Sequence, residues 1–255
     1  MKPASGPPIP INLVERVRSA QSIVVLTGAG VSAESGVPTF RDAQTGLWTN
    51  YRPEDLATPE AFQRNPRLVW EWYAMRREKV LTVAPNPGHR ALVAMERVVR
   101  EFLLVTQNVD GLHQRAGSRQ VCELHGNIGR TKCFQENRVI EQWVDDGQVP
   151  PRCPQCGGWL RPDVVWFNEA LPKAELIRAT SASRRCQVFF SVGTSAMVYP
   201  AAGLSQEAFE ARAVVVEINP QPTPLTERAH HFLQGPSGVI LPELVRAVWG
   251  EQAVP

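Results

Sequence analysis

The sequence predicts an α/β protein with a Rossmann-like, doubly wound parallel sheet and a smaller inserted lobe. Apolar, largely β-branched runs bounded by turn-forming residues predict four strands, at residues 22–27, 101–106, 187–192 and 213–218. Such runs are typical of strands buried on both faces of a parallel sheet. The stretches between them are long enough for crossover helices. This alternation predicts the α/β class.

Three intervening segments have the apolar spacing of helices, at residues 12–20, 89–100 and 200–211. In the second segment Leu92, Met95 and Val99 recur at intervals of three and four residues, which places them on one helix face. We therefore expect these segments to pack against the sheet as helices.

Two segments interrupt the pattern and suggest how the chain is divided. Residues 45–87 are rich in Trp and Arg, with a helix expected around residues 68–80, and residues 126–168 carry three cysteines among many turn-forming residues. We interpret them as the helical module and the zinc-ribbon-like module of one small lobe. The remaining residues would form the Rossmann-like domain: 1–44, 88–125 and 169–255.

The composition excludes several classes of protein. The 255 residues are 43% hydrophobic, which argues against a disordered chain, and 27 Lys and Arg stand against 25 Asp and Glu without any long basic run. No apolar run approaches the roughly 18–20 residues that cross a bilayer. Five cysteines, an odd number, favour a reducing compartment. We expect a cytoplasmic protein without a nucleic-acid or membrane partner, for which a monomer is plausible.

Small polar residues follow each predicted strand, beginning at Gly28, Gln107, Gly193 and Asn219. Ligands of open parallel sheets bind at the carboxyl ends of the strands, so these clusters should converge on one site. The alternative is that such residues only make the turns. Four clusters together favour a ligand site.

The first of these clusters matches the G-x-G-x-x-A pattern of dinucleotide-binding folds through Gly28, Gly30 and Ala33, with Ala29 between the glycines. Glycines let the backbone approach a pyrophosphate, and the following helix start offers free N–H groups. An ordinary dehydrogenase would carry an acidic residue at the end of a second strand about 20 positions later. No strand precedes residues 42–48, which disfavours that class.

Four longer strings, at residues 28–41, 106–113, 123–126 and 193–195, closely resemble the sirtuin family of NAD-dependent protein lysine deacylases. They occur in the family's order, and the resemblance extends over about residues 20–245. It implies a Rossmann-like domain, a zinc-bearing lobe, and NAD and acyl-lysine meeting between the two.

The resemblance also implies roles for single residues. Phe40 would shield the reactive sugar carbon, and Arg41 would face the diphosphate with the backbone of residues 28–33. Asn108 and Asp110 would act on the nicotinamide carboxamide. The ribose and adenosine contacts would come from Gln107, Gly193, Thr194, Ser195 and Asn219.

His125 is the expected general base, which takes a proton from a ribose hydroxyl of NAD. The ordinary pKa of histidine, about 6.5, lies near the working pH. The products would be nicotinamide, free lysine and O-acyl-ADP-ribose. We interpret His113 as structural, and find no signal for His89.

Cys153 and Cys156 have the C-x2-C spacing of half a zinc ribbon. In the other half, Cys133 is present, but Glu136 stands where a second cysteine is expected. A carboxylate can bind zinc, so the four residues could still form a tetrahedral site. Alternatively the site is weak or lost. Cys122 and Cys186 are expected to be buried as small apolar residues.

Residues 162–169 resemble the segment of the family on which a substrate peptide adds as a β-strand. Val165, Trp166 and Phe167 are the expected substrate contacts, although a buried core strand would show the same pattern. Sirtuins commonly have glycine where this chain has Asn168, which puts the backbone geometry there in question.

Tyr73 and Arg76 lie three residues apart, so on a helix they share one face. An arbitrary pair of this kind would be a packed tyrosine beside a solvated arginine. Here it stands where the sirtuins that act on succinyl-lysine and malonyl-lysine (class III) carry a Tyr-x-x-Arg pair, and residues 33–38 resemble that subclass as well. The resemblance implies desuccinylase and demalonylase activity with some deacetylase activity.

Two other functions are compatible with parts of the pattern. A non-catalytic NAD or ADP-ribose sensor would keep the nucleotide cleft, but would have no need for His125. A dehydrogenase would transfer hydride, but lacks the ribose-binding acid.

Overall fold

The computed structural model describes residues 8–37, 52–144 and 147–253. A six-stranded sheet forms its centre, with all neighbouring strands parallel. In spatial order the strands are β3 (Val121–Glu123), β2 (Glu101–Thr106), β1 (Ser22–Thr27), β6 (Val188–Val192), β7 (Val214–Asn219) and β8 (His231–Gln234). This is the strand order of a Rossmann fold.

The four predicted strands are confirmed within one residue at each end. β3 and β8 were not predicted. Both are short edge strands that contain polar residues, so neither produces the continuous apolar run of a central strand. β3 pairs with β2, and β8 pairs with β7.

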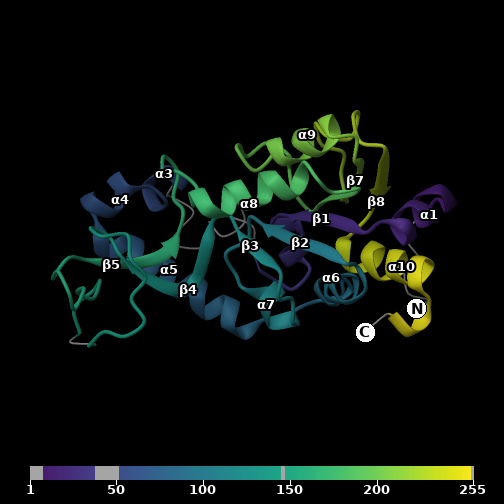
Figure 1. Ribbon diagram of the computed structural model, residues 1–255. Coiled ribbons are helices and arrows are strands. Elements are labelled where there is room, and N and C mark those ends of the chain that lie inside the picture. The colour runs from purple at the N-terminus through teal and green to yellow at the C-terminus, as the bar shows by residue number, and fades with distance from the viewer. Residues whose placement is uncertain (1–7, 38–51, 145–146, 254–255) are drawn as a thin grey trace.

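Helices cover both faces of the sheet (Figure 1). One face packs against α1 (Ile11–Ser19), α6 (Pro87–Val98) and α10 (Ser237–Trp249), and the other against α8 (Lys173–Ser183) and α9 (Gly203–Glu210). Alternate strand residues serve the two layers: Val25 of β1 lies in the first core and Leu26 in the second. The predicted doubly wound architecture is therefore confirmed.

A second, smaller set of elements lies beside the carboxyl ends of β1 and β2 (Figure 1). Its helices are α3 (Pro53–Leu56), α4 (Pro59–Arg64) and α5 (Pro66–Thr82), and its antiparallel pair is β4 (Gly126–Cys133) with β5 (Leu160–Val164). Thr58 and Asn65 cap α4 and α5 by accepting backbone hydrogen bonds, each with proline at the first helical position. These elements have an apolar core of their own, which includes Phe62, Trp72 and Trp166.

Three short helices complete the described elements: α2 (Ala29–Ala33), α7 (Leu112–Ala116) and the 3₁₀ helix η2 (Glu251–Ala253). In the part of the chain that the structure describes, no helix has the length and apolar character needed to span a membrane.

Candidate active site

The backbones after β1 and β6 are in direct contact at the centre of the sheet. The N–H of Gly30 donates to the carbonyl of Gly193 at 2.8 Å, and a Cβ on Gly193 would lie 2.6 Å from the nitrogen of Val31. Gly193 also has φ +60°, a conformation that favours glycine. The close approach of the two backbones also requires a glycine at position 28, where a Cβ would lie 2.8 Å from the carbonyl oxygen of Gly193.

Side chains from three strand ends meet around Thr194. Its hydroxyl accepts a hydrogen bond from Nε2 of Gln107 at 3.2 Å, and its carbonyl accepts one from Nδ2 of Asn219 at 3.5 Å. The predicted ribose and adenosine contacts that follow β2 and β6 and end β7 are thus brought together. Ser195 and Ala29 are exposed beside them.

Asn108 is buried and its amide group is held in one orientation. Its Nδ2 donates to the carbonyl of Gly28 at 2.9 Å and to Oγ of Ser32 at 3.1 Å. Both amide hydrogens are therefore used, which leaves the carbonyl oxygen Oδ1 for a ligand.

Asp110 lies beside Asn108 in the same loop. Burial raises the pKa of its carboxyl group, while hydrogen bonds from the N–H of Leu112 and from Ser32, with the charge of Arg76, act in the opposite direction. Ser32 therefore contacts both predicted nicotinamide-binding residues. Sequence reasoning missed this role, although Ser32 lies inside the G-x-G-x-x-A string.

The ring of His125 is held in the orientation and tautomer of a base. Its Nδ1 lies 2.9 Å from the carbonyl oxygen of Gln107. A carbonyl only accepts, so Nδ1 carries the hydrogen and the lone pair is on Nε2. Burial lowers the pKa of His125, and the bond to Gln107 opposes this shift. The imidazole is therefore neutral near pH 7.

The predicted substrate segment, residues 162–169, begins within β5 and continues beyond the end of that strand at Val164. The N–H of Val165 donates to the carbonyl of His125, and that of Phe167 to the carbonyl of Ala57, both at 2.9 Å. Trp166 is only 2% exposed and belongs to the core, whereas Phe167 is 51% exposed. The segment thus continues as an irregular extension of β5 with alternating buried and exposed side chains.

Asn168 follows this segment with φ +70°. This is the left-handed region, which asparagine adopts more readily than other residues with a side chain. The replacement of glycine by asparagine therefore retains the backbone conformation that a glycine would allow.

Tyr73 and Arg76 both lie on α5, as expected. The hydroxyl of Tyr73 accepts a hydrogen bond from Nε1 of Trp166 at 3.0 Å, and burial raises the pKa of Tyr73 to about 12. The guanidinium of Arg76 lies 4.7 Å from the ring centroid of Trp72. Burial lowers the pKa of Arg76, and the nearby Tyr73 and Asp110 counteract it. The pair therefore borders the loop that contains Asp110.

The four predicted metal ligands form one cluster. Their ligand atoms all lie within 4.8 Å of one another, and Sγ of Cys133 is 3.4 Å from Sγ of Cys156. Zn–S bonds of about 2.3 Å in a tetrahedron place sulfur atoms a little under 4 Å apart, so the spacing fits. Three thiols and one carboxylate are consistent with structural zinc, the ligands being Cys133, Glu136, Cys153 and Cys156.

Other predicted residues lie apart from this site. Cys122 and Cys186 are buried, and so is His113, whose Nε2 lies 2.9 Å from Oγ1 of Thr27. His89 caps α6 together with Asn86. Phe40 and Arg41 lie outside the described residues.

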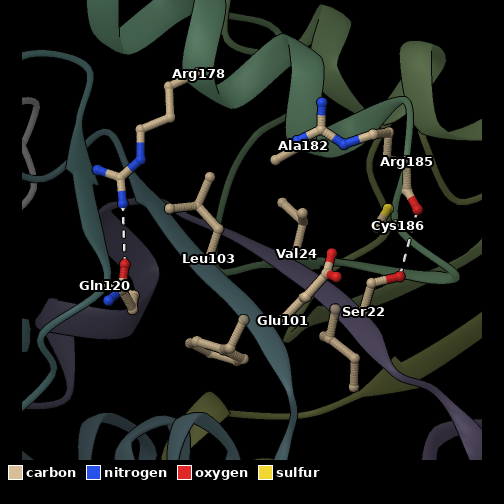
Figure 2. A pocket seen from close by; sticks show the side chains of 11 residues that line it. Ser22, Val24, Glu101, Leu103, Gln120, Arg178, Ala182, Arg185 and Cys186 are labelled. Carbon is tan, nitrogen blue, oxygen red and sulfur yellow. Dashed lines mark hydrogen bonds between the residues drawn. The ribbon is translucent and has the colours of Figure 1, made fainter.

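A cavity of about 210 Å³ opens at the opposite edge of the sheet, where β1 and β2 begin (Figure 2). Arg178 and Arg185 border it, but their guanidinium groups are bonded within the fold, to Gln120 and to Ser181. The candidate active site is therefore not this cavity, but the carboxyl edge, where the predicted residues converge.

The profile of the Sir2 family matches residues 28–200, from the glycine after β1 to the turn before α9. The chain belongs to the Sir2 family. Its fold, strand order and cysteine cluster agree with that membership.

Three relatives illustrate the similarity to other Sir2 proteins. The NAD-dependent protein deacylase of Aquifex aeolicus is 54% identical over 213 residues, which cover 83% of this chain and 89% of the relative. A Sir2 homolog solved as an NAD complex is 44% identical with a TM-score of 0.88, covering 99% of this chain and 98% of that one. Sir2Af2, solved with a myristoylated histone peptide, is 35% identical with a TM-score of 0.75, covering 93% of this chain and 94% of that one.

Proposed function

We propose that this chain is an NAD-dependent protein lysine deacylase, which transfers the acyl group of an acyl-lysine to ADP-ribose and releases nicotinamide. Relatives with about half of their residues identical are named as NAD-dependent protein deacylases, and solved homologues hold NAD or an acylated peptide. The partners would be acyl-lysine proteins. We place the chain in the cytoplasm, with the Rossmann-like domain at residues 1–44, 88–125 and 169–255.

The observation that carries the proposal is the state of His125. Its Nδ1–H donates to the carbonyl of Gln107, so its basic nitrogen is Nε2. Gln107 belongs to the same loop as Asn108 and Asp110. A nucleotide sensor would have no use for a neutral, oriented imidazole at this position. General bases of this kind typically contribute about 10²- to 10⁴-fold to a rate.

In this proposal NAD is a substrate that supplies the ADP-ribose acceptor. The close-packed glycines Gly28, Gly30 and Gly193, which have no side chains, would let its diphosphate approach the backbone. Oδ1 of Asn108 would accept a hydrogen bond from the carboxamide of nicotinamide, with Asp110 beside it. His125 would take a proton from a ribose hydroxyl at Nε2. The main chain of residues 165–167 would contact the substrate peptide.

The zinc site would stabilise the small lobe. Cys133, Cys153, Cys156 and Glu136 would close a four-ligand structural site, with no open position for a reacting molecule. Zinc would act through folding energy and take no part in the reaction.

The proposal extends to the acyl group. Tyr73 and Arg76 together offer a hydroxyl and a guanidinium, which match the distal carboxylate of succinyl-lysine or malonyl-lysine. The methyl group of acetyl-lysine would gain no hydrogen bond from these two side chains. We therefore propose higher catalytic efficiency on succinyl-lysine than on acetyl-lysine, with some deacetylase activity remaining.

The test of the reaction is the release of nicotinamide from NAD with and without an acyl-lysine peptide. Release that depends on the peptide, together with O-acyl-ADP-ribose, is the expected result. Formation of NADH would support a dehydrogenase, and binding of NAD without either product would support a sensor.

The test of the acyl group compares succinyl and acetyl peptides of the same sequence with Arg76→Met. Losing one partner of a desolvated charged pair costs about 2–5 kcal/mol, roughly 30-fold or more in the succinyl rate. Arg77→Met is the matched control on the same helix, because Nε of Arg77 donates to the carbonyl of Ile128 in the fold. A wild-type preference for acetyl-lysine would contradict the assignment.

A further inference from the structure

We propose that Trp166 is a positioning residue for acyl-group selection, acting through the hydroxyl of Tyr73. The inference rests on the proposed function, since it concerns the far end of the same acyl-lysine site. It assigns the indole N–H a role in specificity that is separate from contact with the substrate peptide.

The first step is the hydrogen bond between the two side chains. Nε1 of Trp166 donates to Oη of Tyr73 at 3.0 Å, and the two residues are only 2% and 4% exposed. An indole N–H can only donate, so the phenol oxygen is the acceptor and its own proton points elsewhere. The hydroxyl proton of Tyr73 is thereby left to donate to another acceptor, for which a bound ligand is our proposal.

The second step is that Trp166 is itself held rigidly. The guanidinium of Arg161 lies 3.2 Å from its ring centroid, and its main-chain N–H donates to Oε2 of Glu169 at 2.8 Å. Arg161 and Glu169 form a two-point ion pair, with Nη2 and Oε2 2.9 Å apart. The ring of Phe62 packs from another side, at 5.3 Å between centroids. The indole therefore has little freedom to release Tyr73.

The third step links this arrangement to the acyl group. A carboxylate has only acceptor atoms, so a hydroxyl that is oriented as a donor favours it, whereas the methyl end of an acetyl group gains nothing from such a donor. Arg76, three residues after Tyr73 on α5, supplies the opposite charge. Trp166 should therefore affect carboxylated acyl groups more than acetyl.

The experiment measures kcat/KM for succinyl-lysine and acetyl-lysine peptides with Trp166→Phe, which retains an aromatic ring and removes the N–H. The succinyl-to-acetyl ratio should fall about 2- to 12-fold, the range expected for one neutral hydrogen bond. The double variant Trp166→Phe/Tyr73→Phe should have the same succinyl-to-acetyl ratio as Tyr73→Phe alone, because the hydrogen bond is already absent there. Trp159→Phe, a tryptophan of the same lobe stacked on Arg152, is the matched control.

A second measurement does not require Trp166→Phe to fold. The seven tryptophans give indole N–H resonances in ¹⁵N-labelled protein. Without NAD, the succinyl peptide should shift one of them more than the acetyl peptide does, and Tyr73→Phe should abolish that difference. Indole spectra that are the same with both peptides would overturn the inference.

The outcomes also separate this inference from the proposed function. If the unaltered chain releases no nicotinamide with either peptide, the proposed function fails. If it turns over both peptides and Trp166→Phe leaves their ratio unchanged, or changes it equally in the Tyr73→Phe background, only the role of Trp166 is wrong.

Discussion

The carbonyl oxygen of His125 accepts a hydrogen bond from the main-chain N–H of Val165 at 2.9 Å. The side chain of the same histidine is bonded to the carbonyl of Gln107. His125 is therefore fixed from two directions, by the loop after β2 and by the segment after β5. In the proposed reaction, this residue connects the NAD side of the site to the substrate side.

Replacing His125 with alanine should lower turnover about 10²- to 10⁴-fold and leave NAD affinity nearly unchanged, because a base contributes to the transition state more than to ground-state binding. Because burial lowers the pKa of His125, the wild-type acid limb of kcat/KM should lie below the ordinary histidine value of about 6.5. Titration calorimetry with NAD and a pH profile of nicotinamide release check both. A loss of NAD affinity as large as the loss of rate would show that His125 has another role.

Gly193→Ala should weaken NAD binding at least 10-fold and destabilise the fold by about 2 kcal/mol or more, since the new Cβ meets the nitrogen of Val31 in a left-handed backbone. Gly203→Ala is the control, because a Cβ there makes only an ordinary contact at 3.9 Å with Tyr199. Urea unfolding and NAD titration measure the two effects. Equal behaviour of the two variants would rule out the packing argument.

Protein purified without chelator should contain about one zinc per chain, and Cys156→Ser should lower both the zinc content and the thermal midpoint, because structural metal binding contributes folding energy. Elemental analysis and thermal unfolding provide the readouts. Glu136→Cys should retain zinc more strongly against a chelator, since thiolate suits zinc better than carboxylate.

Cys186→Ala is the control for the zinc prediction, since this buried cysteine lies outside the cluster. It should keep the full zinc content. A stable wild-type chain without zinc would show that Glu136 marks a lost site.

Asn168→Gly should be tolerated, because both residues adopt the left-handed conformation, whereas Asn168→Val should cost about 1–2 kcal/mol. The exposed position makes lost packing a minor contribution. Denaturant unfolding of both variants measures the difference. Equal stability of the valine and glycine variants would contradict the backbone explanation.

Stability should fall as the pH drops below about 6.5. Burial lowers the pKa of His89 to about 4 and that of His113 well below its ordinary value, so the unfolded chain binds protons in this range and the folded chain does not. Between these pKa values, each histidine lowers the free energy of unfolding by up to about 1.4 kcal/mol for every pH unit of acidification. This loss is absent above pH 6.5 and grows towards pH 4.

Comparing urea unfolding of wild type and His113→Gln between pH 7.5 and 5 isolates one of these groups. The amide of glutamine can still donate to Thr27 but does not titrate, so the variant should show a shallower slope by up to one proton. An unchanged slope would mean that His113 is protonated in the folded chain.

The sequence by itself determined the central strands, the order of the Sir2 motifs and the residues of the metal cluster. Residues 22–27 and 101–106 are continuous apolar runs, and a run of this kind is stable only when buried on both faces of a sheet. The C-x2-C spacing of Cys153 and Cys156 likewise indicates a metal site from residues that are close in the sequence. These signals depend on neighbours in the sequence, so they can be read without the fold.

The tertiary structure decided the contacts between residues that are distant in the sequence. Trp166 and Tyr73 are 93 positions apart, and the bonds of Glu34 to the start of α10 span about 200. The role of Ser32 and the tautomer of His125 depend on such contacts. These contacts could not be predicted from the sequence because hydrogen bonds are short and directional. Their partners are fixed only when packing sets the register of separate elements.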